Sequence, residues 1–242
     1  NRVRAQNFRG AWSFGIVEGL GLLSDIIPIQ DLEEDMDIAE LLGITKFEEP
    51  EPADPNIEAG LPYWLRRSSE DQWEVCGVGQ HIGKQVDVTL KIDGKSQTLL
   101  DKGRECVFSR TSLFKEGTDN EYTRSVINQG LFGKIKEIEQ RYEAKVGLRG
   151  ELFRGEFYLY GVYGLDTMEN FQKYSDLYFV KVAKEFDIKC VPVIEESVFL
   201  TQELIDHYQQ AETLQGKAFE GVVIVGEGFS FKVINLHYDS KK

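Results

Sequence analysis

The sequence lacks long apolar runs and has little cysteine. No run of about 18 apolar residues occurs, so the sequence predicts no membrane-spanning helix. No basic and then apolar leader precedes a small-residue cleavage site, so nothing indicates secretion. The three cysteines, Cys76, Cys106 and Cys190, are widely spaced and fit neither a disulfide framework nor a four-ligand zinc site. They are typical of a reducing compartment, so we expect an intracellular protein, cytoplasmic or, in a eukaryote, nuclear.

An excess of basic residues is also absent. The net charge is −13, which argues against nucleic-acid binding because phosphate contacts need basic surface. Residues 31–58, however, hold 11 of the 41 acids and one base, so the rest of the chain carries 30 acids and 27 bases. We interpret the acidic segment as a solvated linker and helix, and the nearly balanced remainder leaves nucleic-acid binding open.

The composition and the pattern predict a folded α+β protein. The chain is 41% hydrophobic and 12% aromatic, and its 242 residues suit one large domain, or one domain with a fragment of a neighbour. Residues 1–60 are interpreted as a lead-in and a proline-rich linker, with a short acidic helix at 31–43, and residues 61–242 as the main domain. We expect antiparallel sheets flanked by helices. Strands are expected at 85–92, 97–101, 104–110, 148–153, 177–182, 189–194, 221–225 and 229–235, and helices at 121–145 and, after an N-cap at Thr201, at 201–214.

Lys91 stands late in an expected strand, immediately before an Asp93-Gly94 turn. A lysine that leaves a sheet into a cleft becomes a nucleophile if it is desolvated or lies close to other cations. The plain alternative is a hairpin with Asp-Gly at its turn and an exposed lysine. By itself, the Lys-x-Asp-Gly motif is a weak signal.

Other charged residues follow Lys91 in a definite order, each set into an apolar, strand-like stretch. They are Arg110, Glu151, Glu220 and Lys232. A nucleotide pocket needs side chains on rigid strands that converge on one ligand. The order and the spacing together therefore predict a nucleotide site.

This ordered set resembles the covalent nucleotidyltransferases, which are the ATP-dependent DNA and RNA ligases and the mRNA capping enzymes. The motifs Lys-x-Asp-Gly, Ser-Arg, Gly-Glu, Glu-Gly-Val-Val and Phe-Lys match between Lys91 and Lys232. The stretches 8–15 and 39–48 resemble the lead-in of the Deinococcus- and Naegleria-type RNA ligases, which seal nicks. In that subgroup a small OB-like domain comes first, so the resemblance implies that residues 61–242 are the adenylyltransferase domain and that the chain begins within the end of a preceding domain.

The resemblance implies an ATP-dependent RNA ligase that acts in RNA repair. Lys91 would attack the α-phosphorus of ATP and hold AMP covalently, AMP would pass to a 5′-phosphate, and a 3′-OH would then seal the nick. The implied cofactors are ATP and Mg²⁺ or Mn²⁺. The implied substrate is nicked duplex RNA, or an RNA/DNA hybrid, with 5′-phosphate and 3′-OH ends. We expect a monomer without membrane attachment.

The resemblance also implies roles for the other residues. Lys232 suits the α-phosphate and a catalytic role beside Lys91. Glu220 suits a divalent metal, and Glu151 suits a ribose hydroxyl or the same metal. Arg110 suits the ribose or the sealed strand. Asp93 and Gly94 would bind the nucleotide mainly by shaping the turn.

The sequence departs from the family at two places. The adenine-stacking ring is expected from residues 176–182, but Val180 occupies the usual phenylalanine position. Strand alternation would put Tyr178 on the face of Val180 and turn Phe179 away, and the choice between Tyr178 and Phe179 stays open. Ser230 stands where other ligases often have a lysine. The segment 155–164, rich in glycine and tyrosine, is interpreted as a loop packed on the core, with base stacking as the alternative.

Two other functions stay open at this point. An mRNA capping guanylyltransferase would use GTP in place of ATP. A non-catalytic module would bind nucleic-acid ends without forming an adduct, but it would not need the intact set of Lys91, Glu151, Glu220 and Lys232. The three histidines are too far apart in the sequence to indicate a metal site.

Overall fold

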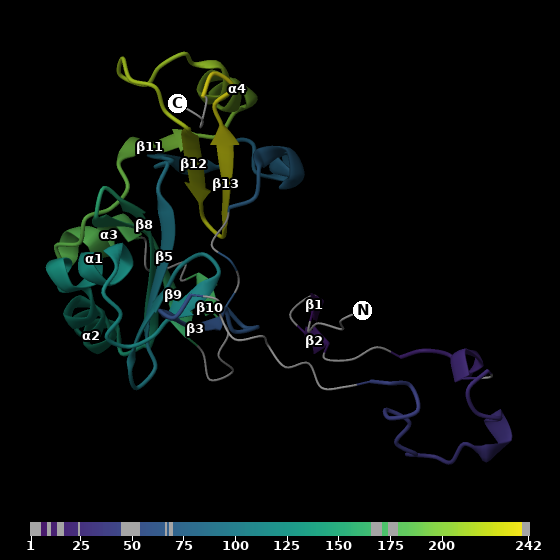
Figure 1. The fold of residues 1–242 in the computed structure, drawn as a ribbon. Coiled ribbons are helices and arrows are strands. Elements are labelled where there is room, and N and C mark those ends of the chain that lie inside the picture. The colour runs from purple at the N-terminus through teal and green to yellow at the C-terminus, as the bar shows by residue number, and fades with distance from the viewer. Residues whose placement is uncertain are drawn as a thin grey trace. The chain divides into compact units, whose positions relative to one another are not determined.

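The fold is taken from a computed structural model of the chain. It describes residues 6–8, 11–13, 17–23, 25–44, 54–65, 67, 70–165, 171–173 and 179–238. The chain divides into two compact units, residues 1–51 and 52–242 (Figure 1). Among the described residues, no helix combines the length and the hydropathy that a membrane crossing requires.

The elements in the described residues of the first unit are short. β1 (Gln6–Phe8) pairs with β2 (Ala11–Ser13), and two 3-10 turns follow, η1 (Leu20–Leu23) and η2 (Ile29–Asp31). The α-helix expected at 31–43 is wrong, since Asp31 ends η2 and the residues that follow form turns at 34–35 and 39–43. Asp35 adopts a left-handed φ of 62°, and the Asp37 carboxylate accepts from the Ala39 amide at 2.9 Å, so two aspartates favour turns over a helix.

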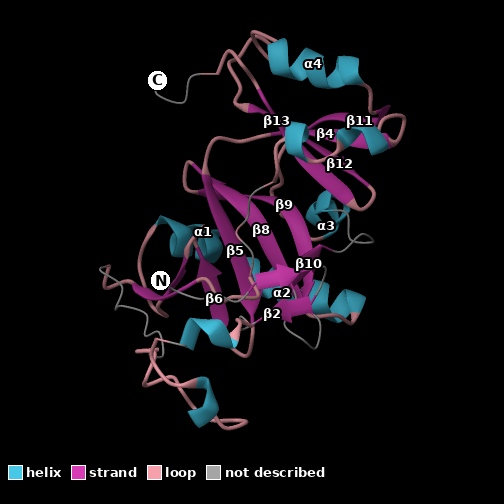
Figure 2. Cartoon of the chain, turned by 90° about the vertical axis from the view of Figure 1, so that its right-hand side faces the viewer, coloured by secondary structure: helices cyan, strands magenta, loops and turns pink. Residues whose placement is uncertain are grey.

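The larger sheet of the second unit has seven strands in the order β10-β9-β8-β5-β6-β7-β3, and neighbouring strands are antiparallel (Figure 2). Its strands are β3 (Ile57–Gly60), β5 (Lys95–Asp101), β6 (Glu105–Phe108), β7 (Ser112–Phe114), β8 (Val146–Phe153), β9 (Glu156–Leu165) and β10 (Phe171–Lys173). This sheet thus takes in β3, which the sequence places in the linker.

Helices α1 (Glu121–Gln129), α2 (Leu131–Tyr142) and α3 (Phe179–Glu185) pack against this sheet and bury its core (Figure 1). The single helix expected at 121–145 is two helices, because Gly130 takes a left-handed φ of 61° between them. The Asn120 side chain caps α1 by accepting from the Thr123 amide at 3.0 Å.

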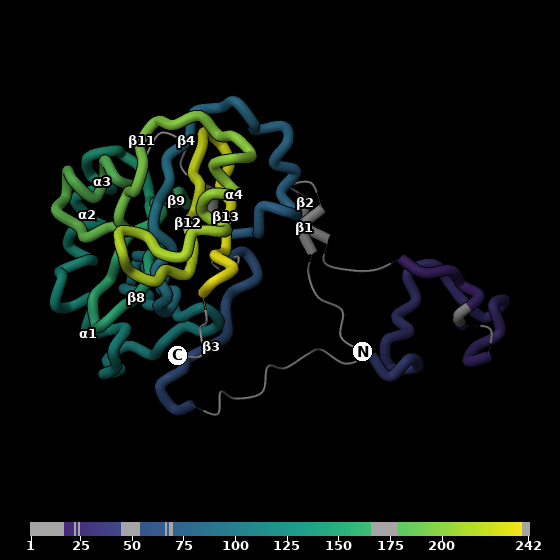
Figure 3. Tube along the Cα trace, turned by 90° about the horizontal axis from the view of Figure 1, so that it is seen from above, coloured from purple at the N-terminus to yellow at the C-terminus, as the bar shows by residue number. Residues whose placement is uncertain are grey.

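The smaller sheet has four strands in the order β11-β4-β12-β13. They are β11 (Val193–Phe199), β4 (Gln85–Leu90), β12 (Gly221–Gly226) and β13 (Phe229–Ile234). Helix α4 (Gln202–Gln210) packs on β12 and β13 (Figure 3), and Thr201 caps it as expected, accepting from the Leu204 amide at 3.1 Å. Two short 3-10 turns, η3 (Trp73–Val75) and η4 (Val78–Gln80), precede β4.

Three further local expectations are wrong in the second unit. The strand expected at 189–194 lies later in the chain, since β11 begins at Val193. Residues 179–182 form the start of α3 in place of a strand, because a short apolar run fits either element and packing decides. The segment 155–164 lies mostly in β9 and is no loop, since its alternation sends Phe157 and Leu159 into the core. The α+β class with antiparallel sheets and flanking helices is confirmed.

The connection from β4 to β5 decides where a site can form. β4 belongs to the smaller sheet and β5 to the larger one, so residues 91–94 cross from sheet to sheet. The hairpin alternative for Lys-x-Asp-Gly is therefore wrong. A crossing segment is exposed to the space between two sheets, whereas a hairpin turn points into solvent.

Candidate active site

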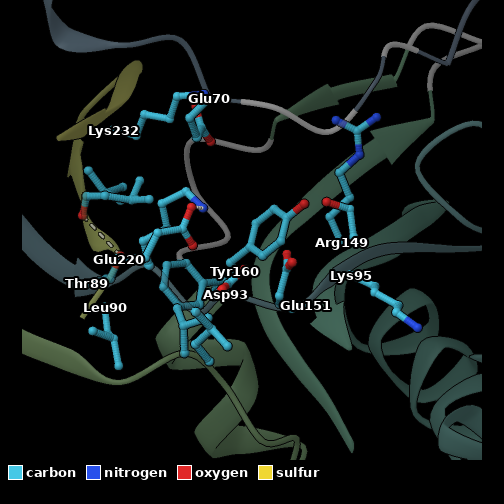
Figure 4. Close-up of a pocket in the computed structure, with 18 of the residues that line it drawn as sticks. Glu70, Thr89, Leu90, Asp93, Lys95, Arg149, Glu151, Tyr160, Glu220 and Lys232 are labelled. Carbon is cyan, nitrogen blue, oxygen red and sulfur yellow. Dashed lines mark hydrogen bonds and ion pairs between the residues drawn. The ribbon is translucent and has the colours of Figure 1, made fainter. Parts of the chain in front are cut away.

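A cavity of about 570 Å³ lies where the two sheets of the second unit face each other (Figure 4). Every predicted site residue that the structure describes lines it: Lys91, Asp93, Gly94, Arg110, Glu151, Phe179, Glu220 and Lys232. Tyr178 lies outside the described residues. The cavity volume is within the range of small-molecule sites.

Lys91 leaves β4 toward the cavity with its backbone held, since its amide donates to the Gly221 carbonyl at 3.0 Å. Its ammonium forms an ion pair with Glu220, and the two side chains are 25% and 19% exposed. Lys91 is thus partly desolvated, as the sequence interpretation requires, but its close partner is a carboxylate rather than another cation. The amine has to leave Glu220 before it can attack an electrophile.

Gly94 is required for the close approach of the crossing segment to β8. A Cβ atom at this position would lie 2.6 Å from the Leu152 carbonyl oxygen and 2.8 Å from the Glu151 Cγ. Such contacts are shorter than real side chains allow, so a larger residue would push the segment off β8. Gly94 thereby sets the distance between the Lys91 segment and Glu151.

Glu151 is a carboxyl with an altered proton affinity. The pKa of its carboxyl is raised to about 7, mainly by burial and in part by the charge of Glu220, whereas Lys91 and the Gly94 amide act in the opposite direction. Glu151 therefore exchanges a proton near neutral pH, which an exposed glutamate does not do.

Glu220 fits a role as a metal ligand. One carboxylate oxygen pairs with Lys91, and the other, Oε2, is buried without a hydrogen-bond partner among the described residues. A buried carboxylate oxygen without a partner is costly, and a bound cation would satisfy it. The described part of the chain holds no group of three or more His, Cys, Asp or Glu side chains that could bind a metal. A divalent cation at Glu220 and Glu151 would therefore need further oxygens, which the phosphates of a nucleotide supply.

Lys232 lies on β13, opposite Val223 of β12, and reaches the cavity from the smaller sheet (Figure 4). Its amide donates to the Asp71 carbonyl at 2.9 Å, which ties this strand to the segment before η3. Two residues earlier, the Ser230 hydroxyl donates to the Glu70 carboxylate at 2.7 Å. Ser230, where a second lysine was expected, thus holds an acid at the edge of the cavity.

Phe179 lines the cavity at the start of α3 and is 2% exposed. The expectation that strand alternation turns Phe179 away is wrong because the residue begins a helix. Three other apolar or aromatic side chains line the cavity and belong to, or pack against, the same core cluster as Phe179: Ile92, Tyr160 and Val191. They form the surface on which a flat, apolar ring would rest.

The sequence interpretation missed several residues of the wall. Arg149 and Tyr163 line the cavity, and alternation along β8 would have found Arg149, which is two residues from Glu151 and on the same face. The Tyr238 hydroxyl donates to the Asp93 carboxylate, and this hydrogen bond, followed by burial, raises the pKa of Tyr238 to about 12. No local pattern links these two residues, which are 145 positions apart.

Comparison with known proteins gives structural neighbours only: no family model and no curated protein matches the sequence. An RNA ligase of Naegleria gruberi, a variant solved with ATP and Mn, matches with a TM-score of 0.64 and 22% identity over 99% of this chain and 76% of that chain. The same ligase with PPi matches with a TM-score of 0.61 and 22% identity over 97% and 74%. A variant with AMP and Mn gives a TM-score of 0.62 and 20% identity over 100% and 76%. The chain thus has the nucleotidyltransferase fold of an RNA ligase, as the sequence predicts.

Proposed function

We propose that this protein is an ATP-dependent RNA ligase in which Lys91 accepts AMP. One observation carries the proposal: Lys91, Glu151, Glu220 and Lys232, from four strands or strand ends of two sheets, meet in one cavity. The fold, shared with an RNA ligase described with ATP, AMP and PPi, supports it. Residues 61–242 would be the adenylyltransferase domain, with β3 completing its larger sheet.

The first reaction consumes ATP. Lys91 Nζ leaves Glu220, gives up a proton to solvent and forms a bond to the α-phosphorus. The bond from that phosphorus to the oxygen bridging to the β-phosphate breaks, and pyrophosphate leaves with the electron pair. Lys232, which lines the same cavity, would stabilise the α-phosphate oxygens as negative charge builds on them.

The nucleoside fits the rest of the cavity. The adenine would lie on the apolar wall that includes Phe179 and Ile92, and Glu151 and Arg110 would contact the ribose. Glu220 and Glu151 would hold Mg²⁺ or Mn²⁺ together with phosphate oxygens. Such an ion, when bound, supplies positive charge to the phosphates.

The next two reactions use nucleic-acid ends. An oxygen of the 5′-phosphate forms a bond to the phosphorus of AMP while the P–N bond breaks, and Lys91 recovers its electron pair and a proton. The 3′-OH of an RNA strand then loses its proton and forms a bond to the 5′-phosphorus, and AMP leaves. The expected substrate is a nick in duplex RNA, or in an RNA/DNA hybrid, whose 3′-OH strand is RNA.

The test of the first step is covalent labelling with ATP that carries the label in its α-phosphate. Wild-type protein should gain one AMP, seen as added intact mass, and Lys91→Ala should gain none. Lys145→Ala, which changes an exposed lysine paired with Glu139 outside the cavity, is the matched control and should label normally. Equal labelling of the Lys91→Ala variant would refute the assignment, and labelling by GTP in place of ATP would indicate a capping guanylyltransferase.

The test of the later steps uses nicked duplexes in which each strand is RNA or DNA. Sealing should require a 5′-phosphate and an RNA 3′-OH. Binding to the nick without sealing, and without an adduct on the protein, would identify a non-catalytic end-binding module.

A further inference from the structure

Asn235 is a buried polar residue immediately after β13, at the edge of the smaller sheet where Lys91 and Glu220 lie. Only 3% of its surface is exposed. Its backbone amide donates to the Glu220 carbonyl at 2.9 Å, one step beyond the pair of Gly221 and Ile234 at the end of the ladder of β12 and β13. The next carbonyl, that of Gly221, accepts from the Lys91 amide. Two adjacent carbonyls at the start of β12 therefore fix the nucleophile and its carboxylate partner, and Asn235 holds the first of them.

The side chain of Asn235 ties this edge of the sheet to α4, which packs beside β13 (Figure 1). Its Nδ2 donates to the carbonyls of Tyr208 at 3.2 Å and Ala211 at 2.6 Å. These carbonyls belong to the last turn and the C-cap of α4, where a helix supplies no partner of its own. Capping α4 explains these two hydrogen bonds but not the remaining contacts of Asn235.

Asn235 also shapes the turn that follows β13. Its Oδ1 accepts from the His237 amide at 2.8 Å, and its carbonyl accepts from the Tyr238 amide at 3.3 Å. An asparagine that accepts from the amide two residues later in the chain stabilises a turn. The Leu236 amide adds a hydrogen bond to the Gln209 carbonyl at 2.9 Å, but the Leu236 residue is 69% exposed and packs little. Hydrogen bonds, most of them made by Asn235, therefore direct the chain after β13.

The turn brings Tyr238 to the crossing segment. The Tyr238 hydroxyl donates to the Asp93 carboxylate, two residues after Lys91. The crossing segment is thus held at two points, by the Gly221 carbonyl at Lys91 and by the Tyr238 hydroxyl at Asp93. Asn235 stands behind both points, because it bonds the residue before Gly221 and forms the turn that leads to Tyr238.

We infer that Asn235 is a positioning residue of the ligase, which acts on Lys91 through Glu220 and on Asp93 through Tyr238. The inference rests on the proposed function. Asn235 does not line the cavity, so it would touch neither ATP nor the reacting atoms. Its loss should therefore slow the attack of Lys91 on bound ATP more than it weakens ATP binding, since a small misplacement of a reacting group costs rate.

The test measures Lys91 labelling over a range of ATP concentrations in wild type, Asn235→Ala and Asn235→Ser, under conditions in which circular dichroism shows each protein folded. Asn235→Ala should slow labelling at saturating ATP by about 10- to 100-fold and change the KM for ATP by less than about threefold. Serine accepts from the amide two residues later more weakly than asparagine does, so Asn235→Ser should restore part of the rate and remain about three- to tenfold slower than wild type.

Thr201→Ala is the matched control, because it removes a hydrogen bond at the opposite end of α4. It should destabilise the protein in urea unfolding and label at the wild-type rate. A rate loss in Thr201→Ala as large as that in Asn235→Ala would mean that any weakening of α4 slows labelling, and it would overturn the inference.

A double-variant cycle with Tyr238→Phe distinguishes positioning from a general loss of stability. If Asn235 acts through Tyr238, Asn235→Ala should cost less in the Tyr238→Phe protein than in wild type, by about the three- to tenfold that Tyr238→Phe costs by itself. Independent effects would instead multiply, and that result would overturn the inference.

Wild-type rates in either Asn235 variant would also overturn the inference while leaving the proposed function intact. Failure of wild type to form an adduct would instead refute the proposed function. If Asn235→Ala does not fold, Asn235→Ser takes its place in the cycle, with the same two outcomes.

Discussion

Glu151→Gln should make the protein more stable at alkaline pH while it slows Lys91 labelling. Burial raises the pKa of Glu151 from 4.5 to about 7, so the folded state binds this proton more tightly than the unfolded state does. The proton on Glu151 stabilises the folded state fully below about pH 4.5. This stabilisation is lost as the pH rises to about 7 and is absent at higher pH. Over this window the ionised carboxylate costs at most about 3 kcal/mol of unfolding free energy.

Glutamine has the same shape but no charge to desolvate. Its carbonyl oxygen can still accept the hydrogen bond from the Gly94 amide. We therefore expect Glu151→Gln to gain up to about 3 kcal/mol over wild type at pH 8 and less than about 1 kcal/mol at pH 5. Lys91 labelling should fall sharply because a neutral amide binds a divalent metal more weakly than a carboxylate does.

Urea unfolding at pH 5 and pH 8, without metal or nucleotide, measures this difference. Glu156→Gln is the control, because the Glu156 side chain is paired with Lys189 and its pKa is lowered, so its removal should bring no gain at pH 8. A Glu151→Gln variant that is less stable than wild type at pH 8, or whose gain is equal at both pH values, would refute the reasoning.

Three further predictions concern single contacts. Tyr238→Phe should slow Lys91 labelling about three- to tenfold at an unchanged KM for ATP, because Asp93 loses its hydrogen bond; an unchanged rate would contradict this. Gly94→Ala should lower the melting temperature and the labelling rate together, because its Cβ meets the Leu152 carbonyl; normal labelling would show that the segment can shift freely. Thr201→Ala should lose about 1 kcal/mol in urea unfolding with normal labelling, because it removes only the N-cap of α4; a labelling defect would link α4 to the site.

The sequence by itself determined much of the local structure and predicted residues that line one cavity. The two apolar stretches 221–225 and 229–235, which flank the turn at 226–228, predicted β12 and β13, and Thr201 predicted the start of α4. These signals depend on neighbours within a few residues. The types and the order of Lys91, Glu151, Glu220 and Lys232 predicted one site, since each belongs to a short motif that carries its own chemistry.

Local signals failed where packing chooses between two possible elements. The residues from Phe179 to Val182 form a helix where a strand was expected, because a short apolar run suits either element until a neighbouring surface covers it. At Gly130 the expected helix divides, since a glycine inside a helical pattern is compatible with continuation or with a left-handed turn.

Only the tertiary structure decided that residues 91–94 cross between two sheets, because strand pairing depends on partners far away in sequence. The tertiary structure also brought Glu220 into contact with Lys91, which is 129 positions away in the sequence. In the same way it brought Tyr238 into contact with Asp93, which is 145 positions away. It also decided the environment of each charge, and therefore the raised pKa of Glu151 and the burial of Arg149. The physical reason is that desolvation and charge pairing depend on everything within a few ångströms in space, whereas a sequence motif records only what is adjacent along the chain.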